Sequence, residues 1–357
     1  MDLDVLHVLA TNGRRGAETF GYELHQAIRA RGVRSEICCV EPGSQQSLLP
    51  VPALAGRRFS LAGVRALRDR AGRSRIVVAH GSSALLACGL GLAGLGVPFV
   101  YLSIGDPRYW AGSPARRWRA RWLITRADSV VAITPGARDI LIGHYRLVPE
   151  RVVVIPNGRS AKRSRPAEPA ERAAAREVFG IPQGSEAVAV VGSLRREKRV
   201  DVAIEAIARL PGTLLLVAGD GPERPVLEAL AQRVAPDRVV FAGTTDGPGS
   251  VLAAADAVAL SSDSEGVPGV LIEAGLAELP VVATDVGWVR DVVIDRTTGL
   301  VVPPDRPDLF AAALREALDR RAGLGRAART HCLAEFEMER VTELWLDLIS
   351  QPADRTS

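Results

Sequence analysis

The sequence predicts an α/β fold built from two doubly wound domains, each with a parallel sheet. Two observations support this prediction. Short apolar runs alternate with amphipathic helical stretches along almost the whole chain. The alternation is interrupted at 159–177, "RSAKRSRPAEPAERAAARE", where the composition becomes polar, charged and proline-containing, as in linkers between domains. Because strands that alternate with helices form parallel sheets with right-handed crossovers, each half is expected to form one such sheet.

The first half opens with a segment typical of a buried strand, 4–10 ("DVLHVLA"). An amphipathic helical stretch follows it, with Phe20 and Leu24 on the apolar face, and stops at Gly32. The other strands of this half are expected at 34–40, 75–81, 98–104, 129–134 and 151–158.

The segment 84–104 carries no charged residue and has the length that could span a bilayer. Four glycines and Pro98 interrupt it, which favours a buried helix, a turn and a buried strand instead. It also holds a G-x-G-x-x-G match at Gly89, Gly91 and Gly94. Since this match falls late in the expected helix, we reject it as a dinucleotide-binding motif.

The second half repeats the pattern of the first. Its strands are expected at 187–193, 213–219, 238–243, 257–262, 280–285 and 299–304. The predicted organisation is a first domain at 1–160, a linker at 161–178, a second domain at 179–335, and a C-terminal helix that returns to the first domain at 336–357. Ligands of open parallel sheets bind beyond the carboxyl ends of the strands, so we expect the site in the cleft between the domains.

Composition bears on partners and location. The 45 basic and 41 acidic residues leave a net charge of +4, which is weak support for a polyanionic partner, and we expect no nucleic acid. The four cysteines form no C-x-x-C pair, which favours a reducing compartment. The N-terminal "MDLDVLHVLA" has no basic region typical of a signal peptide, so a cytoplasmic protein is expected.

Two glutamates flank a turn in "DSEGVPGVLIEA" (263–274). Glu265 follows an expected strand, and Glu273 lies in the helix after the turn. The N-terminus of that helix suits a phosphate, and Gly266 and Gly269 allow the backbone to come close. Glu265 could accept hydrogen bonds from sugar hydroxyls and Glu273 could hold a ribose diol, as a nucleotide sugar requires. The alternative is that both are solvated and Glu265 only complements the helix dipole.

This segment, together with "LPVVATDVG" after it, resembles the signature of glycosyltransferase family 4, which comprises retaining enzymes of the GT-B fold. The resemblance covers most of the chain and includes "RRGAET", "RADSVVAITPGARDIL", "PERVVVIPNG", "VGSLRREKRVDVAIEAIA", "LLLVAGDGPER" and "FEMERVTELWLDLI". It implies two Rossmann-like domains and a nucleotide-diphosphate sugar as co-substrate, with no resident cofactor. Apart from Asp2-Leu3-Asp4 at the start of the printed sequence, nothing matches the Asp-x-Asp motif of metal-dependent transferases, so no metal is expected.

The resemblance also implies roles for residues. Glu265 would contact the transferred sugar, Glu273 the ribose, and Lys198 the diphosphate; a solvated surface charge is the alternative for Lys198. Thr245 and Asp246 match the place where the family often meets the nucleobase, although turn chemistry explains Asp246 equally well. The implied donor-binding residues are Gly16, Ser193, Arg195, Arg196, Lys198, Thr245, Asp246, Glu265, Gly266, Val267, Pro268, Gly269, Val270, Leu271 and Glu273.

The chain departs from the family pattern at two positions. Ser193 stands where an arginine is usual, so half of the cationic clamp is missing unless Arg195 or Arg196 reaches in. Ile104 stands where the family commonly has a histidine against the sugar.

The loss of that histidine does not exclude activity. In a front-face transfer the departing phosphate oxygen can take the acceptor's proton, so no protein base is required. The orienting role could pass to His80 or Asp106, which complete the expected catalytic set with Glu265 and Lys198. A satisfied strand-end histidine is an equal alternative for His80.

The stretch 108–126, "RYWAGSPARRWRARWLITR", interleaves tryptophans with arginines. It could form a membrane-surface helix that serves a lipid-linked acceptor. The pattern favours the other interpretation, in which Trp118 and Trp122 pack on the sheet and the arginines are solvated.

We therefore expect a metal-independent, retaining hexosyltransferase that acts on a hydroxyl acceptor: a natural product, another small molecule or a lipid-linked glycan. The loops 41–60 and 104–116 are expected to form the acceptor pocket. Two alternatives remain: a GT-B relative that acts as an epimerase or a phosphorylase, and a nucleotide-sugar-binding protein without turnover. The sequence names neither the donor nor the oligomeric state.

Overall fold

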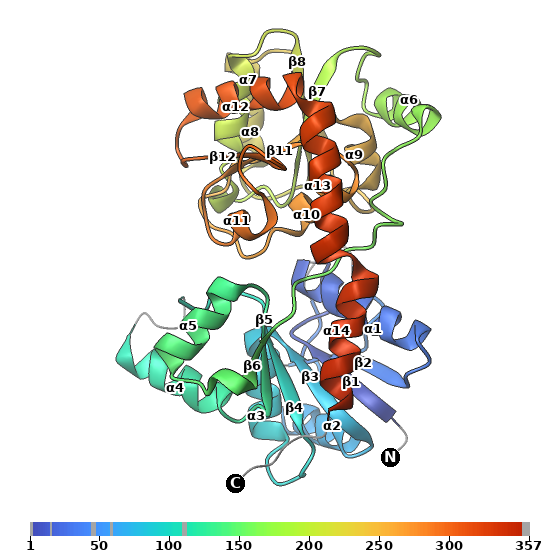
Figure 1. The fold of residues 1–357 in the computed structure, drawn as a ribbon, viewed down its shortest axis with the longest axis vertical. Coiled ribbons are helices and arrows are strands. Elements are labelled where there is room, and N and C mark those ends of the chain that lie inside the picture. Colours follow the sequence, from blue (N-terminus) through green and yellow to red (C-terminus); the bar gives the residue numbers. More distant parts are fainter. Residues whose placement is uncertain (1–2, 15, 44–47, 58–59, 109–112, 352–357) are drawn as a thin grey trace. The chain divides into compact units, whose positions relative to one another are not determined.

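The computed structural model describes residues 3–14, 16–43, 48–57, 60–108 and 113–351. The chain divides into two compact units (Figure 1). Unit 1 contains the residues up to Gly158 together with those from Met338 onward, and unit 2 contains Arg159–Glu337. All four cysteines are buried and free of disulfide bonds.

Unit 1 is built on a six-stranded parallel sheet in the order β2-β1-β3-β4-β5-β6. Its strands are β1 (Leu3–Leu9), β2 (Ser35–Cys39), β3 (Ser74–His80), β4 (Phe99–Ser103), β5 (Ser129–Ala132) and β6 (Val152–Val154). Its helices are α1 (Gly16–Ala30), α2 (Leu61–Ala71), α3 (Gly81–Gly91), α4 (Pro114–Ile124), α5 (Pro135–Tyr145) and α14 (Met338–Ser350), and a 3₁₀ turn spans Pro149–Arg151.

Unit 2 contains a second six-stranded parallel sheet, in the order β12-β11-β10-β7-β8-β9. Its strands are β7 (Glu186–Val191), β8 (Thr213–Ala218), β9 (Val239–Gly243), β10 (Ala257–Leu260), β11 (Val281–Thr284) and β12 (Gly299–Val302). Its helices are α6 (Pro169–Val178), α7 (Val200–Ala208), α8 (Arg224–Val234), α9 (Gly249–Ala254), α10 (Gly269–Leu276), α11 (Val289–Val292), α12 (Pro307–Asp319) and α13 (Arg321–Phe336), with a 3₁₀ turn, η3, at Arg196–Lys198.

The prediction of two parallel α/β sheets is confirmed, and every expected strand is present. The uncharged segment 84–104 forms the end of α3, a turn and the buried strand β4, as expected. The prediction of a linker over 161–178 is wrong for residues 169–178. They form α6, which packs against α9 within unit 2 because Ala175 is buried and Arg176 donates to the backbone oxygen of Ala254 at 3.1 Å.

Helix starts in unit 1 follow local capping chemistry. The hydroxyls of Ser113 and Thr134 accept hydrogen bonds from the backbone N–H groups of Arg116 and Ala137, at 3.3 Å and 3.0 Å. A proline follows each cap, at a position where the missing N–H costs nothing. The short polar signals "SPA" and "TPG" therefore set where α4 and α5 begin.

Helix α14 packs along α1 in unit 1 (Figure 1). Trp345 on α14 is fully buried, and Arg31 and Glu343 form an exposed ion pair at 3.4 Å between the two helix regions. At Gly158 a side chain would crowd α14, since a Cβ there would lie 3.1 Å from the Cβ of Val341. The segment after β6, just before the unit boundary, therefore fits closely against this returning helix.

Three histidines are buried near β1 in unit 1. His7 Nδ1 lies 3.0 Å from His80 Nε2, on the adjacent strand, and His25 Nδ1 lies 2.8 Å from Ser35 Oγ. Burial lowers the pKa of His7 well below its ordinary value, the pKa of His80 to about 3 and the pKa of His25 to about 4. All three rings are therefore neutral at pH 7 in the folded protein.

This arrangement predicts that the protein loses stability on mild acidification. Below about pH 6.5 the unfolded chain takes up protons on these histidines and the native chain does not. The stabilisation present at neutral pH is thus lost as the pH falls towards the folded pKa values. We expect His25→Gln to show a smaller drop in thermal midpoint between pH 7.5 and pH 5 than the wild type. His144→Gln, at an exposed position, is the control, and equal drops in both variants would contradict the prediction.

Candidate functional site

The predicted donor residues of unit 2 gather at the point where its strand order reverses. Strands β7 and β10 are neighbours in the sheet, while β8 and β11 lie on their outer sides. The connections after β7 and β10 therefore leave in opposite directions and open a crevice at the carboxyl end of the sheet, where such folds bind ligands. Turn η3, with Lys198, follows β7, and the loop with Glu265 follows β10.

Lys198 and Glu265 contact each other at this crevice. Lys198 Nζ lies 2.7 Å from Glu265 Oε1, and the hydroxyl of Ser262 donates to the same oxygen at 2.6 Å. The Glu265 side chain is 9% exposed and that of Lys198 is 27% exposed. The sequence assigned these two residues to different parts of a ligand, whereas here the ammonium and carboxylate neutralise each other.

Backbone contacts hold the two loops together. Asp263 N donates to the Glu197 carbonyl at 2.9 Å, and Ser261 Oγ donates to the Lys198 carbonyl at 3.2 Å. Gly287, after β11, has a φ of +55°, and a Cβ there would lie 1.9 Å from the backbone oxygen of Glu265. Only glycine permits that approach, so Gly287 in the "TDVG" segment is a further determinant of the position of Glu265.

The second glutamate lies on α10 and contacts a residue that the sequence analysis missed. Arg159 Nε lies 3.1 Å from Glu273 Oε1, and the side chains are 6% and 19% exposed. A Cβ on Gly269, the first residue of α10, would lie 2.1 Å from Arg159 Nη2. The guanidinium of Arg159 therefore lies against the N-terminal turn of α10. The two partners are 114 positions apart in the sequence, and no local pattern links them.

The hydrophobic members of the predicted donor set contribute mainly to the core. Leu271 is 1% exposed, and Val267 and Val270 are partly buried against the core of unit 2. Pro268 is buried, and Gly266 lies in the bend before it. The structure does not support side-chain contact with a ligand for these residues. Their backbone groups are the part that could contact a ligand.

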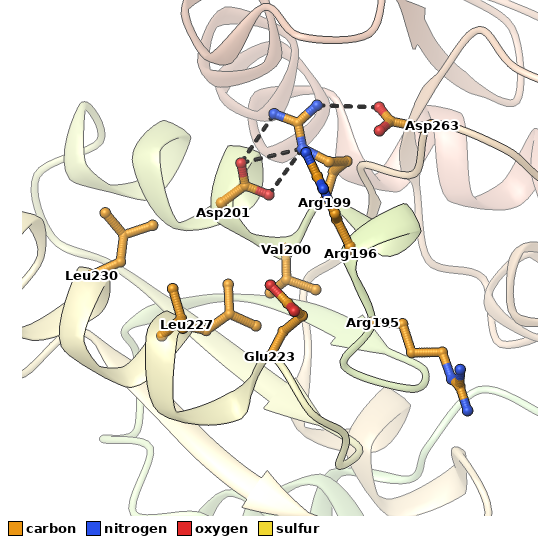
Figure 2. Close-up of a pocket in the computed structure, with 10 residues that line it drawn as sticks. Arg195, Arg196, Arg199, Val200, Asp201, Glu223, Leu227, Leu230 and Asp263 are labelled. Carbon is orange, nitrogen blue, oxygen red and sulfur yellow. Dashed lines mark hydrogen bonds and ion pairs between the residues drawn. The ribbon is translucent and has the colours of Figure 1, made fainter.

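Residues Arg195 and Arg196 line a pocket of about 440 Å³ in unit 2 (Figure 2). Arg199, beside them, forms ion pairs with Asp201 at 3.0 Å and Asp263 at 3.2 Å. Neither Glu265 nor Glu273 lines this pocket. It is therefore a neighbour of the glutamate site, and we base the assignment of the site on the strand ends.

Three further predicted donor residues lie on exposed or half-buried loops. Ser193 is exposed in the loop after β7. Thr245 Oγ1 donates to the carbonyl of Gly247 at 2.9 Å, and Asp246 is exposed in the same turn. The hydroxyl of Thr245 thus serves its own turn, which favours the turn-chemistry explanation for this pair.

The first-domain candidates gather around a pocket of about 250 Å³ in unit 1. It lies at the carboxyl ends of β1, β3 and β4, and its walls include Glu18, His80, Ile104, Asp106 and Tyr145. Gly16 begins α1 nearby, and a Cβ there would meet nothing within 4 Å. The expected acceptor loops 41–60 and 104–116 fall partly outside the described residues.

Within this pocket neither His80 nor Asp106 is arranged as a general base. His80 Nε2 contacts His7, and His80 Nδ1 is buried with no hydrogen-bond partner among the described residues. Burial would raise the pKa of the Asp106 carboxyl, but hydrogen bonds from Arg108, at 2.8 Å to Oδ2, and its charge outweigh this and hold the pKa below its usual value. His80 is therefore not a fully satisfied strand-end histidine, because only its Nε2 is engaged within the described part of the chain.

Helix α4 differs from expectation. The prediction that its tryptophans pack on the sheet is wrong, because Trp118 is 67% and Trp122 is 42% exposed. Ala120 and Ile124 provide the buried face instead. Residues 109–112 of the predicted stretch lie outside the described residues. Within the described part of the chain, no helix is long and apolar enough to cross a membrane.

The close approach at Gly287 generates a testable prediction. Gly287→Ala should lower the free energy of unfolding by about 1–3 kcal/mol from backbone conformation alone, and further because the methyl group collides with the Glu265 carbonyl. Gly180→Ala is the matched control, since its φ is +65° and a Cβ there meets nothing within 4 Å. Urea unfolding measures both variants. Equal losses in the two would show that the contact with Glu265 does not constrain position 287.

Both halves of the chain match family models. The model described as "Glycosyltransferase Family 4" matches residues 14–163, and "Glycosyl transferases group 1" matches residues 171–331. In structure, the chain is similar to HepE from Anabaena, solved in complex with UDP. The TM-score is 0.85 at 21% identity, over 98% of this chain and 100% of that one. This likeness supports the predicted GT-B fold.

Two curated relatives show which family the chain belongs to. Alpha-maltose-1-phosphate synthase from Mycolicibacterium smegmatis is 30% identical over 84% of this chain and 85% of its own length. D-inositol 3-phosphate glycosyltransferase from Mycobacteroides abscessus is 35% identical over 58% of this chain; the match covers about half of that enzyme, 48%. The chain belongs to glycosyltransferase family 4 and has the GT-B fold.

Proposed function

We propose that this protein is a retaining glycosyltransferase that moves a hexosyl group from a nucleotide-diphosphate sugar to a hydroxyl acceptor. The observation that carries the proposal is the placement of Lys198 and Glu265 at the strand-order reversal of unit 2. Membership of glycosyltransferase family 4 and the UDP bound in the structurally similar HepE support it.

The reaction is a front-face substitution at the anomeric carbon. The bond from that carbon to the diphosphate oxygen breaks, the bond to the acceptor oxygen forms on the same face, and the acceptor's proton passes to the departing phosphate oxygen. This route needs no protein base, which agrees with the contact of His80 Nε2 to His7 and the ion pair of Asp106. The protein's part is to orient the reactants and to stabilise the developing negative charge.

Lys198 is the residue that we assign to the leaving diphosphate. In the structure its ammonium forms an ion pair with Glu265. When a nucleotide sugar binds, its diphosphate would therefore join Glu265 as a partner of Lys198 or take its place. Glu265 is held by Ser262 as well, and it can therefore stay in place when Lys198 turns to the phosphate. We also propose that the reaction needs no metal, because Lys198 supplies positive charge at this position.

The alternatives differ in products. Without a hydroxyl acceptor, an epimerase would convert the donor to its epimer, and a phosphorylase given inorganic phosphate would release a sugar phosphate and the nucleoside diphosphate. A binding protein without turnover would bind the nucleotide and give no product with any donor. The altered positions Ser193 and Ile104 are the features that favour this last alternative.

A substitution at Lys198 tests the proposed mechanism. Lys198→Ala should lower kcat/KM by the equivalent of about 1.5–3 kcal/mol, because a charge-assisted contact to the leaving group is lost. Lys162→Ala is the matched control, since Lys162 is the other lysine of the chain and is exposed. Product formation from UDP-, GDP-, dTDP- and ADP-sugars is the measurement. Unchanged turnover in Lys198→Ala would remove Lys198 from the mechanism.

A second proposal concerns α4, which we assign to the surface of an anionic membrane. Its exposed Trp118 and Trp122 are of the type enriched at membrane interfaces. The helix carries four exposed arginines and no acidic residue, and Arg126 lies over the ring of Trp122 at 4.6 Å. Each arginine near an anionic leaflet contributes about 1 kcal/mol of attraction.

Vesicle sedimentation tests this assignment. The protein should sediment with vesicles that contain phosphatidylglycerol and far less with pure phosphatidylcholine, and the double variant Trp118→Ala, Trp122→Ala should lose most of the binding. Leu61→Ala is the control, because Leu61 is 79% exposed on α2 of the same unit. Equal sedimentation of the double variant and the control would refute a membrane role for α4.

A further inference from the structure

Arg159 has an unusual environment for an arginine. Its side chain is only 6% exposed, although arginine side chains are mostly exposed. The backbone is fixed, since Arg159 N donates to the Phe336 carbonyl at 2.8 Å and the residue forms a parallel bridge with Glu337. The guanidinium therefore has a defined position against α10.

The guanidinium of Arg159 lies in a region of positive electrostatic potential. It lies against Gly269 at the N-terminus of α10, where the helix itself has positive potential. A cation is unfavourable there unless negative charge compensates it. Glu273 provides one carboxylate, with 3.1 Å between its Oε1 and Arg159 Nε. The N-terminus of α10 itself attracts an anion, and the guanidinium presents N–H donors beside it.

The order of groups in a nucleotide indicates which phosphate would lie next to Arg159. The resemblance to glycosyltransferase family 4 implies that Glu273 holds the ribose, and the phosphate next to the ribose follows immediately along the donor. A group that contacts both Glu273 and the first residue of α10 lies between these two parts. The chain also has Ser193 at a position without positive charge, so a second cation has to come from elsewhere.

We infer that Arg159 is a donor-binding residue, which contacts the phosphate adjacent to the ribose while its Nε keeps the Glu273 carboxylate in place. The inference rests on the proposed function and adds to it the second cation of the diphosphate site. Arginine suits this double task because its planar guanidinium presents several N–H donors in fixed directions.

Calorimetric titration with three related ligands tests the inference. The probes are UDP, UMP and uridine, or the corresponding set for whichever of UDP, GDP, dTDP and ADP binds the wild type most tightly. Arg159→Gln should bind the diphosphate and the monophosphate roughly 10- to 100-fold more weakly, as expected for a lost charge-assisted hydrogen bond. Its affinity for the nucleoside should stay close to that of the wild type.

Two further variants separate the phosphate contact from a structural effect. Arg159→Lys keeps a cation and should recover part of the affinity for UDP. Arg233→Gln, at an exposed position on α8, is the control and should bind like the wild type. The thermal midpoint of each ligand-free variant shows whether it is folded, and Arg159→Lys decides the question if Arg159→Gln is not.

Several results would overturn the inference. Unchanged or tighter diphosphate binding in Arg159→Gln would show that the guanidinium does not bind phosphate. Equal losses for nucleoside and diphosphate would show that Arg159 acts only through Glu273. Equal binding by Arg159→Lys and Arg159→Gln would exclude a role for charge. If the wild type binds none of the four diphosphates, the proposed function falls with the inference; if it does bind one, only the role of Arg159 is at stake.

Discussion

The ion pair between Lys198 and Glu265 joins the two strand ends on which the candidate site of unit 2 depends. Strands β7 and β10 are adjacent in the sheet but 65 or more residues apart in the sequence, and their connections diverge. The pair, with the contacts from Ser261, Ser262 and Asp263, holds these diverging loops at one place. Charge that is buried in this way has to stay paired, so a ligand that displaces one partner must replace its charge.

The same rule applies to the second glutamate. Glu273 and Arg159 form another opposite-charge contact, and the two pairs lie at the two ends of the segment from Glu265 to α10. A nucleotide sugar can satisfy both kinds of side chain: its diphosphate accepts hydrogen bonds from the cations, and its hydroxyl groups donate hydrogen bonds to the carboxylates. In the ligand-free site the charged side chains pair with one another. A nucleotide sugar can replace these ion pairs with its own contacts and leave no charge unpaired.

Much of the fold could be predicted from the sequence because strand and helix patterns are local. Every strand was expected from an apolar run of the right length. Glu265 and Glu273 were found because they lie in one continuous motif. Arg159 was missed because its partner is distant in sequence. The side of α4 that faces the sheet was predicted wrongly because the spacing of its tryptophans does not show which face of the helix is buried. Polar composition suggested a linker where α6 has a buried face, supplied by Ala175 and Arg176.

The membership of α14 in unit 1 has a consequence for synthesis of the protein. Residues 159–337 form unit 2 without interruption, whereas unit 1 needs helix α14, which the ribosome makes only after all of unit 2. While the nascent chain grows, the side of α1 that α14 covers stays open, and its apolar surface is available to chaperones. Completion of unit 1 therefore waits until unit 2 and α14 have been translated.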